Sequence, residues 1–102
     1  MNPFITQIKK EASSILQKGD TMFLYGSRAR GDNHVYSDWD LLILTRDMDE
    51  NDAFEKYIYP LVLFGQKNNQ EISVITYSQK EWEDRKATPF YQNIKNDKIQ
   101  LF

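Results

Sequence analysis

Cysteine is absent from this chain of 102 residues, so neither a disulfide bond nor a thiolate metal site can form. Histidine occurs once, as His34, and we expect it to be a solvated loop residue rather than a metal ligand. No apolar run approaches the roughly 18 residues of a membrane span, and the first ten residues lack the apolar stretch of a signal peptide. We therefore expect a cytoplasmic protein with no membrane partner.

An excess of positive charge is also missing. Lys and Arg number 13 against 15 Asp and Glu, which gives a formal net charge of -2 and a pI near 5.3. This balance argues against broad binding to a nucleic-acid backbone, so we expect no role on long DNA or RNA. Repeats and low-complexity segments are lacking too. The 40% hydrophobic and 14% aromatic content supplies one modest core, which predicts a single domain over residues 1–102.

Helix and strand patterns alternate along the chain. Apolar residues at helical spacing predict a first helix that begins near Pro3 and stops by Gly19, and a second helix near 52–65 that Pro60 kinks or divides. The other predicted elements are strands near 21–25, 38–45 and 71–77, a short helix opened by a capping box at 78–81, a final helical turn or two after residue 89, and a terminal edge or trailing segment at 99–102. This order predicts an α/β fold with a small mixed β-sheet and flanking helices.

Gly26 and Ser27 follow a short predicted strand and are suited to hold a phosphate. Glycine lets the backbone turn sharply and approach a ligand closely, and Ser27 is predicted to be the N-cap of a short helix. Backbone N–H groups at such a helix start favour phosphate, and Arg28 and Arg30 add positive charge nearby. A plain turn with a helix cap, followed by solvated arginines, is the alternative interpretation.

Asp38 and Asp40 begin the next predicted strand, after ten residues that separate Ser27 from Asp38. Successive side chains of a strand point to opposite faces, so both carboxylates share one face at a spacing of about 6.5 to 7 Å. Two carboxylates at this spacing can converge on a hard divalent cation, which would offset their repulsion. The pattern predicts a metal site beside the phosphate-binding turn. Capping of a strand or turn is the alternative for Asp38.

Together, the glycine-serine pair and the two aspartates resemble the signature of the minimal nucleotidyltransferases of the DNA polymerase beta superfamily. The resemblance implies a nucleotidyltransferase fold similar to the palm domain of those polymerases. It also implies ATP as nucleotide substrate, two Mg2+ ions as cofactors, and transfer of a nucleoside monophosphate to a hydroxyl acceptor. The implied metal ligands are Asp38 and Asp40, and the implied nucleotide-binding residues are Gly26, Ser27, Arg28 and Arg30.

Two-metal phosphoryl transfer usually needs a third carboxylate, because one metal must hold and activate the incoming hydroxyl. Glu71 is our candidate for this catalytic and metal-binding role, since it opens a predicted strand that could lie beside the aspartates. In the resembled family the third acid, often Asp, comes from such a strand. Ser73 shares the face of Glu71 and is a candidate substrate contact. An ordinary exposed charge at a strand end is the other open interpretation of Glu71.

The resemblance also implies a partner. Minimal members of the family are often paired with a helical HEPN-type protein as the antitoxin that neutralises a ribonuclease toxin, in some pairs by AMP transfer to a toxin tyrosine. We therefore expect adenylylation of such a partner, with the acceptor held by the partner or by a second copy in a homo-oligomer. The alternatives are a small acceptor such as an aminoglycoside, and a non-catalytic module that blocks its partner by contact.

Two further patterns do not predict a site. The acidic stretch 47–52 lacks the glycine and the bidentate glutamate that an EF-hand would need at positions 52 and 58, so we predict a solvated loop with a helix N-cap. Trp82, Phe90 and Tyr91 could form a platform for a nucleobase. Packing in the core or against a partner is the more frequent use of such aromatic residues.

Overall fold

A four-stranded mixed sheet in the order β3-β2-β1-β4 organises the computed structural model, which describes residues 2–102. The central strands β1 and β2 are antiparallel, β2 and β3 are parallel, and β4 pairs antiparallel with the outer side of β1. The strand bounds are Thr21–Tyr25 for β1, Trp39–Thr45 for β2, Ile72–Ser78 for β3 and Ile99–Gln100 for β4. The three predicted strands and the terminal edge are thus confirmed.

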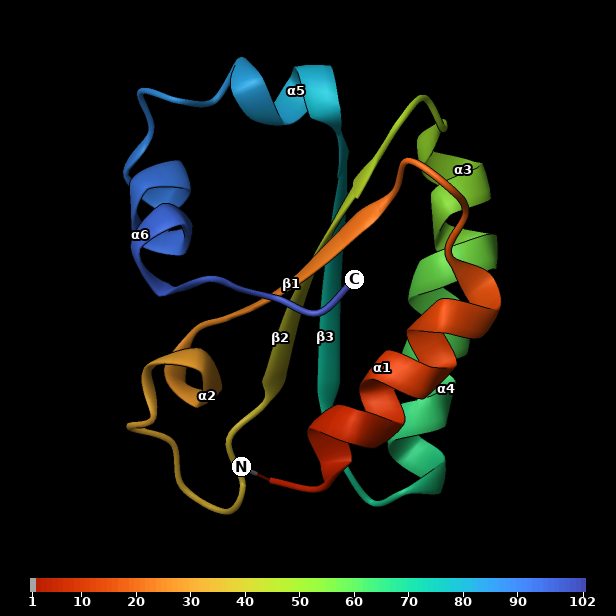
Figure 1. The fold of residues 1–102 in the computed structure, drawn as a ribbon, viewed down its shortest axis with the longest axis vertical. Coiled ribbons are helices and arrows are strands. Elements are labelled where there is room, and N and C mark those ends of the chain that lie inside the picture. Colours follow the sequence, from red (N-terminus) through yellow and green to blue (C-terminus); the bar gives the residue numbers. More distant parts are fainter. Residues whose placement is uncertain (1) are drawn as a thin grey trace.

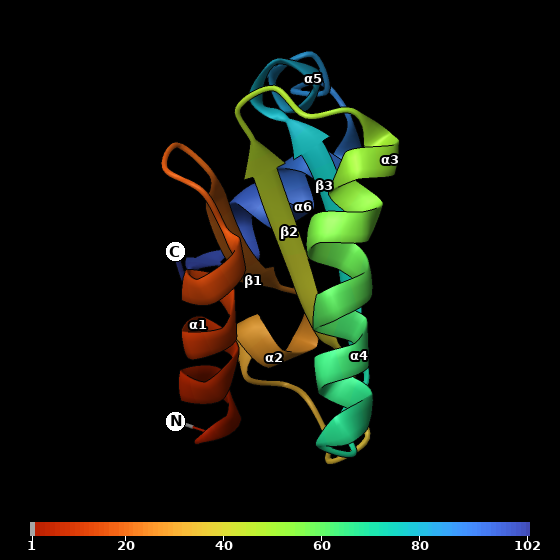
Figure 2. The same ribbon diagram turned by 90° about the vertical axis from the view of Figure 1, so that its right-hand side faces the viewer.

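Helices cover both faces of this sheet (Figures 1 and 2). On one face lie α1 (Phe4–Ile15) and a continuous helical run formed by α3 (Glu50–Ala53), the π-helical turn η1 (Phe54–Ile58) and α4 (Tyr59–Lys67). On the other face lie α5 (Gln79–Glu83) and α6 (Pro89–Asp97). The short helix α2 (Ser27–Arg30) follows β1 and packs through Ala29 against the core on the α1 side. In residues 2–102 no helix has the length and apolar character needed to cross a membrane.

The larger core lies between the sheet and the α1 and α4 side. It contains the apolar stripe of α1 and the side chains of the central strands that point to this face, among them Phe4, Ile8, Met22, Leu24, Trp39, Leu41, Ile43, Tyr57 and Leu61. The stripe forms because residues four apart lie on one side of a helix. This core holds one face of the central strands against α1 and α4. Their opposite face is therefore left to carry the site.

Pro60 divides the second predicted helix, as expected. Proline has no N–H to donate and its ring clashes with the carbonyl four residues earlier, so the α-helical ladder cannot continue through it. The chain responds with the wider turn η1 just before α4, in which Pro60 occupies the first turn. Asp49 caps the start of the run by accepting a hydrogen bond from the Asp52 N–H, which confirms the helix cap predicted for the acidic stretch.

A smaller core lies on the face that carries α5 and α6. Ser78 and Glu81 form the predicted capping box of α5 in both directions, and Thr88 caps α6 ahead of Pro89. Trp82 and Ile94 then pack on Phe23 and Leu42 of the central strands. Trp82 and Tyr91 therefore serve as core residues, whereas Phe90 stays exposed.

Candidate active site

The candidate site lies where β1 ends and β2 begins. Tyr25, the last residue of β1, pairs with Asp40, the second residue of β2. Gly26 follows with φ 75°, a backbone conformation that side chains rarely adopt. A Cβ atom at residue 26 would overlap a carboxylate oxygen of Asp40. The glycine is therefore needed because the turn passes directly over this carboxylate.

The short helix α2 begins immediately after that turn. The predicted position of its cap needs a correction, because Gly26 is the N-cap and Ser27 is already the first helical residue. The Gly26 carbonyl accepts hydrogen bonds from the N–H groups of Ala29 and Arg30 at 3.1 and 3.0 Å. Since the glycine makes the turn without a side-chain cap, the structure gives the Ser27 hydroxyl no capping bond.

Arg28 braces the loop that joins α2 to β2. Its Nε donates to the Ser37 carbonyl at 2.9 Å, its Nη2 donates to the Val35 carbonyl at 3.3 Å, and its guanidinium lies 4.2 Å from the centre of the Trp39 ring. These contacts fix the loop that delivers Asp38. The side chain is thereby engaged with the protein, so nucleotide binding by Arg28 stays a prediction that would need these contacts to change.

Arg30 connects the site to α6. Its guanidinium pairs with Asp97 at 2.7 Å and with Asp32 at 3.1 Å. Its positive charge also offsets part of the rise in the pKa of Asp40, so it acts on the site even while paired. Arg30 thus holds α6 beside the turn, and its predicted role in nucleotide binding stays a prediction.

Asp38 and Asp40 lie close enough for the charge of Asp38 to act on Asp40, and their placement on one face of the strand stays a prediction. Asp38 is exposed just before β2, and Asp40 is half-buried within it. The pKa of Asp40 is raised, first by burial and then by the negative charge of Asp38, and only the Arg30 charge opposes the shift. No hydrogen bond from residues 2–102 contributes to this balance. The pair is therefore short of positive charge, which a bound cation would supply.

The sheet register places Ser73, rather than Glu71, directly beside Asp40 on the parallel strand β3. Glu71 lies two residues earlier, is exposed, and accepts a hydrogen bond from the Trp39 N–H through its carbonyl at 2.8 Å. Across residues 2–102, no three acidic, histidine or cysteine side chains gather closely enough to hold a metal. Glu71 thus does not join the pair, and its role as third ligand stays a prediction.

Tyr25 is a site residue that sequence reasoning missed. It lies beside Asp40, and burial, followed by the charges of Asp40 and Tyr77, raises its pKa to about 12. Its hydroxyl is consequently a protonated donor at neutral pH. Phe90 of α6 meets the Tyr25 ring edge-on at 6.2 Å between centroids. The sequence feature that could have identified Tyr25 is its position one residue before Gly26. Strand alternation places Tyr25 on the same face as Phe23, which is the face of Asp40.

His34 and its neighbours complete the loop before Asp38. His34 Nδ1 accepts a hydrogen bond from the Tyr36 N–H at 3.2 Å, and Tyr36 itself is 84% exposed, with Val35 exposed beside it. The histidine lies in an exposed loop, as predicted. An apolar, solvent-facing patch therefore adjoins the carboxylates.

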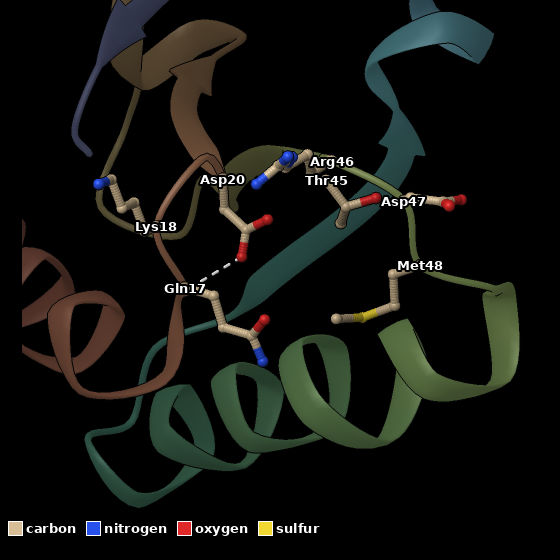
Figure 3. Close-up of a pocket in the computed structure, with 7 residues that line it drawn as sticks. All are labelled: Gln17, Lys18, Asp20, Thr45, Arg46, Asp47 and Met48. Carbon is tan, nitrogen blue, oxygen red and sulfur yellow. Dashed lines mark hydrogen bonds between the residues drawn. The ribbon is translucent and has the colours of Figure 1, made fainter.

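A separate pocket of about 450 Å³ lies at the other end of β2 (Figure 3). Gln17, Asp20, Thr45 and Arg46 are among the side chains around it. Asp20 is 7% exposed, and it accepts hydrogen bonds from the Gln17 N–H at 2.9 Å and from the Tyr57 hydroxyl. This carboxylate is already satisfied by the protein, so the chemistry of the turn and the carboxylate pair is not repeated here.

The turn, the carboxylate pair and the mixed sheet define a nucleotidyltransferase. Residues 5–100 match the nucleotidyltransferase domain family, and the chain belongs to that family. A protein of Methanocaldococcus jannaschii to which protein adenylyltransferase activity is attributed is 38% identical over 76 residues, which make up 74% of this chain and 77% of that protein.

Two crystal structures of toxin–antitoxin pairs contain chains with the same fold. The first, determined with AMP-PNP, matches with a TM-score of 0.64 and 20% identity over 96% of this chain and 72% of that chain. The second, a mutant of the pair MntA–HpeT, matches with a TM-score of 0.65 and 18% identity over 100% of this chain and 73% of that chain. At these identities the likeness shows the fold, which is the nucleotidyltransferase fold that the sequence predicted.

Proposed function

We propose that this nucleotidyltransferase transfers AMP from ATP to a hydroxyl group of a partner protein, and that the partner is the toxin of a toxin–antitoxin pair. The observation that carries the chemistry is the carboxylate pair under the Gly26 turn, which lacks compensating donors. The relative from M. jannaschii supports a protein acceptor. The toxin–antitoxin structures with the same fold support the kind of partner.

The carboxylate pair fits Mg2+. Asp38 and Asp40 would hold the ion. The negative charge of Asp38 helps to raise the pKa of Asp40, and a bound cation would relieve this repulsion. Bound Mg2+ supplies positive charge that neutralises the triphosphate and stabilises the charge that develops during transfer. Because residues 2–102 gather only two such side chains at the turn, a second ion would need oxygen atoms from the nucleotide, from water or from Glu71.

The residues around the pair have separable roles in this proposal. The backbone at Gly26 and the start of α2 bind the phosphates, with the Ser27 hydroxyl as a further donor. The acceptor oxygen forms a bond to the α-phosphorus while the bond from that phosphorus to pyrophosphate breaks. The hydroxyl proton goes to a base on the same face, for which Glu71 is the candidate. The Tyr25 hydroxyl, whose pKa is raised to about 12, stays protonated beside Asp40 as an available donor.

The exposed loop before Asp38 supports a protein acceptor. Val35 and Tyr36 are large apolar or aromatic side chains left in solvent next to the carboxylates. Such a patch is suited to contact with another protein, and a small polar acceptor would gain little from it. We propose that the partner is helical and HEPN-type and that it covers this loop while presenting a hydroxyl to the site.

The test is Mg2+-dependent transfer of label from α-labelled ATP to a candidate partner. We expect label on the partner with the wild type and none with Asp40→Asn. Asp47→Asn is the matched control, because it removes an exposed aspartate at the opposite end of β2 and should leave transfer unchanged.

Two results would contradict parts of the proposal. Label on a small acceptor with the isolated chain, and none on any protein, would replace the protein acceptor. Neutralisation of the partner by Asp40→Asn without any labelling would remove the catalytic account in favour of inhibition by contact.

A further inference from the structure

The outer edge of β3 is open. β3 is the terminal strand of the sheet, and the Trp39 N–H of β2 donates to the Glu71 carbonyl at 2.8 Å. In a parallel ladder the residues of a strand alternate between the two neighbouring sides. Residues 71, 73, 75 and 77 therefore direct their backbone groups toward β2, while Ile72, Val74 and Thr76 direct theirs away from the sheet. The same alternation occurs on β1, where the backbone groups of Met22 point toward β4. The Met22 N–H donates to the Phe102 carbonyl, and the Met22 carbonyl accepts from the Leu101 N–H.

The β3 edge lacks the features that usually prevent an exposed sheet edge from pairing with another strand. Natural edges are usually short, or carry charged residues, prolines or bulges. β3 is seven residues long and reads Ile-Ser-Val-Ile-Thr-Tyr-Ser, without charge, proline or glycine. The opposite edge, β4, has only two residues, and Lys98 precedes it. One edge of the sheet is thus protected, and the other is suited to accept a further strand.

An apolar groove runs along the open edge. It has a volume of about 520 Å³ and lies between β3 and the helical run, with Phe54, Ile58, Val74 and Thr76 among its lining residues. Phe54 is 52% exposed and Tyr59 is 56% exposed, with 6.4 Å between their ring centroids. Backbone donors and exposed aromatic surface therefore occur at the same place, which is what the addition of a strand would bury.

We propose that a second copy of this chain pairs with β3 through its own β3, antiparallel, so that two sheets become one. Identical edges are self-complementary about a two-fold axis. The charges favour the antiparallel arrangement, because Glu50 lies by the Thr76 end of the groove while Lys67 ends α4 just before β3 begins. Antiparallel pairing brings each Glu50 toward the partner's Lys67. It also leaves the two carboxylate sites at opposite ends of the joined sheet, so the pairing does not depend on the proposed function.

Sedimentation equilibrium tests the pairing. We expect twice the monomer mass for the wild type, and at least a tenfold weaker association for Thr76→Pro, because proline removes an outward N–H and is tolerated at sheet edges. Phe54→Ser should weaken association as well. Phe102→Ser is its matched control, since Phe102 is an exposed aromatic residue at the opposite edge of the sheet. Far-UV circular dichroism checks that each variant is folded.

Single cysteines give a second test that does not rely on a disruptive variant. The chain has no cysteine, so Val74→Cys and Ile75→Cys each introduce one thiol near the proposed two-fold axis. One or both should form disulfide-linked dimers on mild oxidation, because opposed residues of antiparallel strands lie within disulfide reach. Ser13→Cys, exposed on α1, should not.

A wild type that stays monomeric at high concentration would overturn the proposal and leave the edge for a strand of another protein. Equal crosslinking through residue 13 would also overturn it, and so would a dimer that Thr76→Pro and Phe54→Ser both leave unchanged.

Discussion

Asp20 and Asp40 are both carboxylates withdrawn from solvent at opposite ends of the central strands, but their surroundings differ. Asp20 accepts hydrogen bonds from the Gln17 N–H and from the Tyr57 hydroxyl, and so ties the turn before β1 to η1. Asp40 has no such donor and faces the negative charge of Asp38. A carboxylate that the protein satisfies is part of the structure, whereas one that it leaves uncompensated is available to a cation.

The largest expected effect is on activity at the uncompensated carboxylate. Asp40→Asn should lower nucleotidyl transfer by about a thousandfold or more, close to 4 kcal/mol of barrier, because it removes a metal-binding charge while keeping the shape of the side chain. Asp20→Asn should leave the rate per folded molecule nearly unchanged. The measurement is release of pyrophosphate in the presence of the acceptor. Equal losses in the two variants would erase the distinction between the carboxylates.

Gly26→Ala should reduce activity by about a hundredfold and destabilise the fold by about 1–3 kcal/mol, because residue 26 has a positive φ and its new Cβ would displace Asp40. Gly31→Ala is the matched control. Its φ of 86° imposes the same kind of strain, but no atom lies within 4 Å of the added Cβ. Thermal unfolding and transfer assays should therefore show a stability loss in both variants and an activity loss only in Gly26→Ala.

Asp20→Ala should lower the free energy of unfolding by about 1–3 kcal/mol, since it leaves the buried hydroxyl of Tyr57 and the Gln17 N–H without their acceptor. Urea unfolding measures the loss. In a double-mutant cycle with Tyr57→Phe, the second substitution should cost less in the Asp20→Ala background than alone. Strict additivity would mean that the hydrogen bond contributes nothing to stability.

The smallest effect is the pH dependence of stability at Asp40. Its folded-state pKa is raised, so its favourable contribution is present below the unfolded pKa of about 3.9 and is lost as pH rises through the folded value. Without Mg2+, Asp40→Asn should therefore be more stable than the wild type at about pH 7, and this advantage should shrink toward about pH 4.

Because Asp40 is only partly buried, that advantage should stay below about 1 kcal/mol. Melting curves with and without Mg2+ measure it. Added Mg2+ should raise the Tm of the wild type and close the gap, with little change for Asp40→Asn. A gap that is independent of both pH and Mg2+ would show that repulsion at Asp40 is not its cause.

Much of the fold follows from local sequence. Proline at position 60 predicts the break that η1 makes, and the capping box at Ser78 and Glu81 predicts the start of α5. These features depend on neighbours within a few residues, so they can be predicted from the sequence alone. The alternation that predicts one face for Asp38 and Asp40 is local in the same sense.

The parts that escaped prediction depend on contacts between distant segments. Glu71 was the candidate third carboxylate, but the register between β2 and β3 put Ser73 beside Asp40. Arg28 has the charge of a phosphate ligand, yet its geometry is set by the Ser37 and Val35 carbonyls and by the Trp39 ring. Tyr25 became a site residue through its pairing with Asp40.

The sequence by itself determined the family, the glycine turn and the carboxylate pair, because each is encoded by residue types at short fixed spacing. Only the tertiary structure decided that Asp20 is satisfied while Asp40 is not, that Arg30 reaches Asp97 of α6, and that one sheet edge stays open. The physical reason is that hydrogen-bond partners, burial and register belong to pairs of segments brought together by folding, and the side chains alone do not specify them.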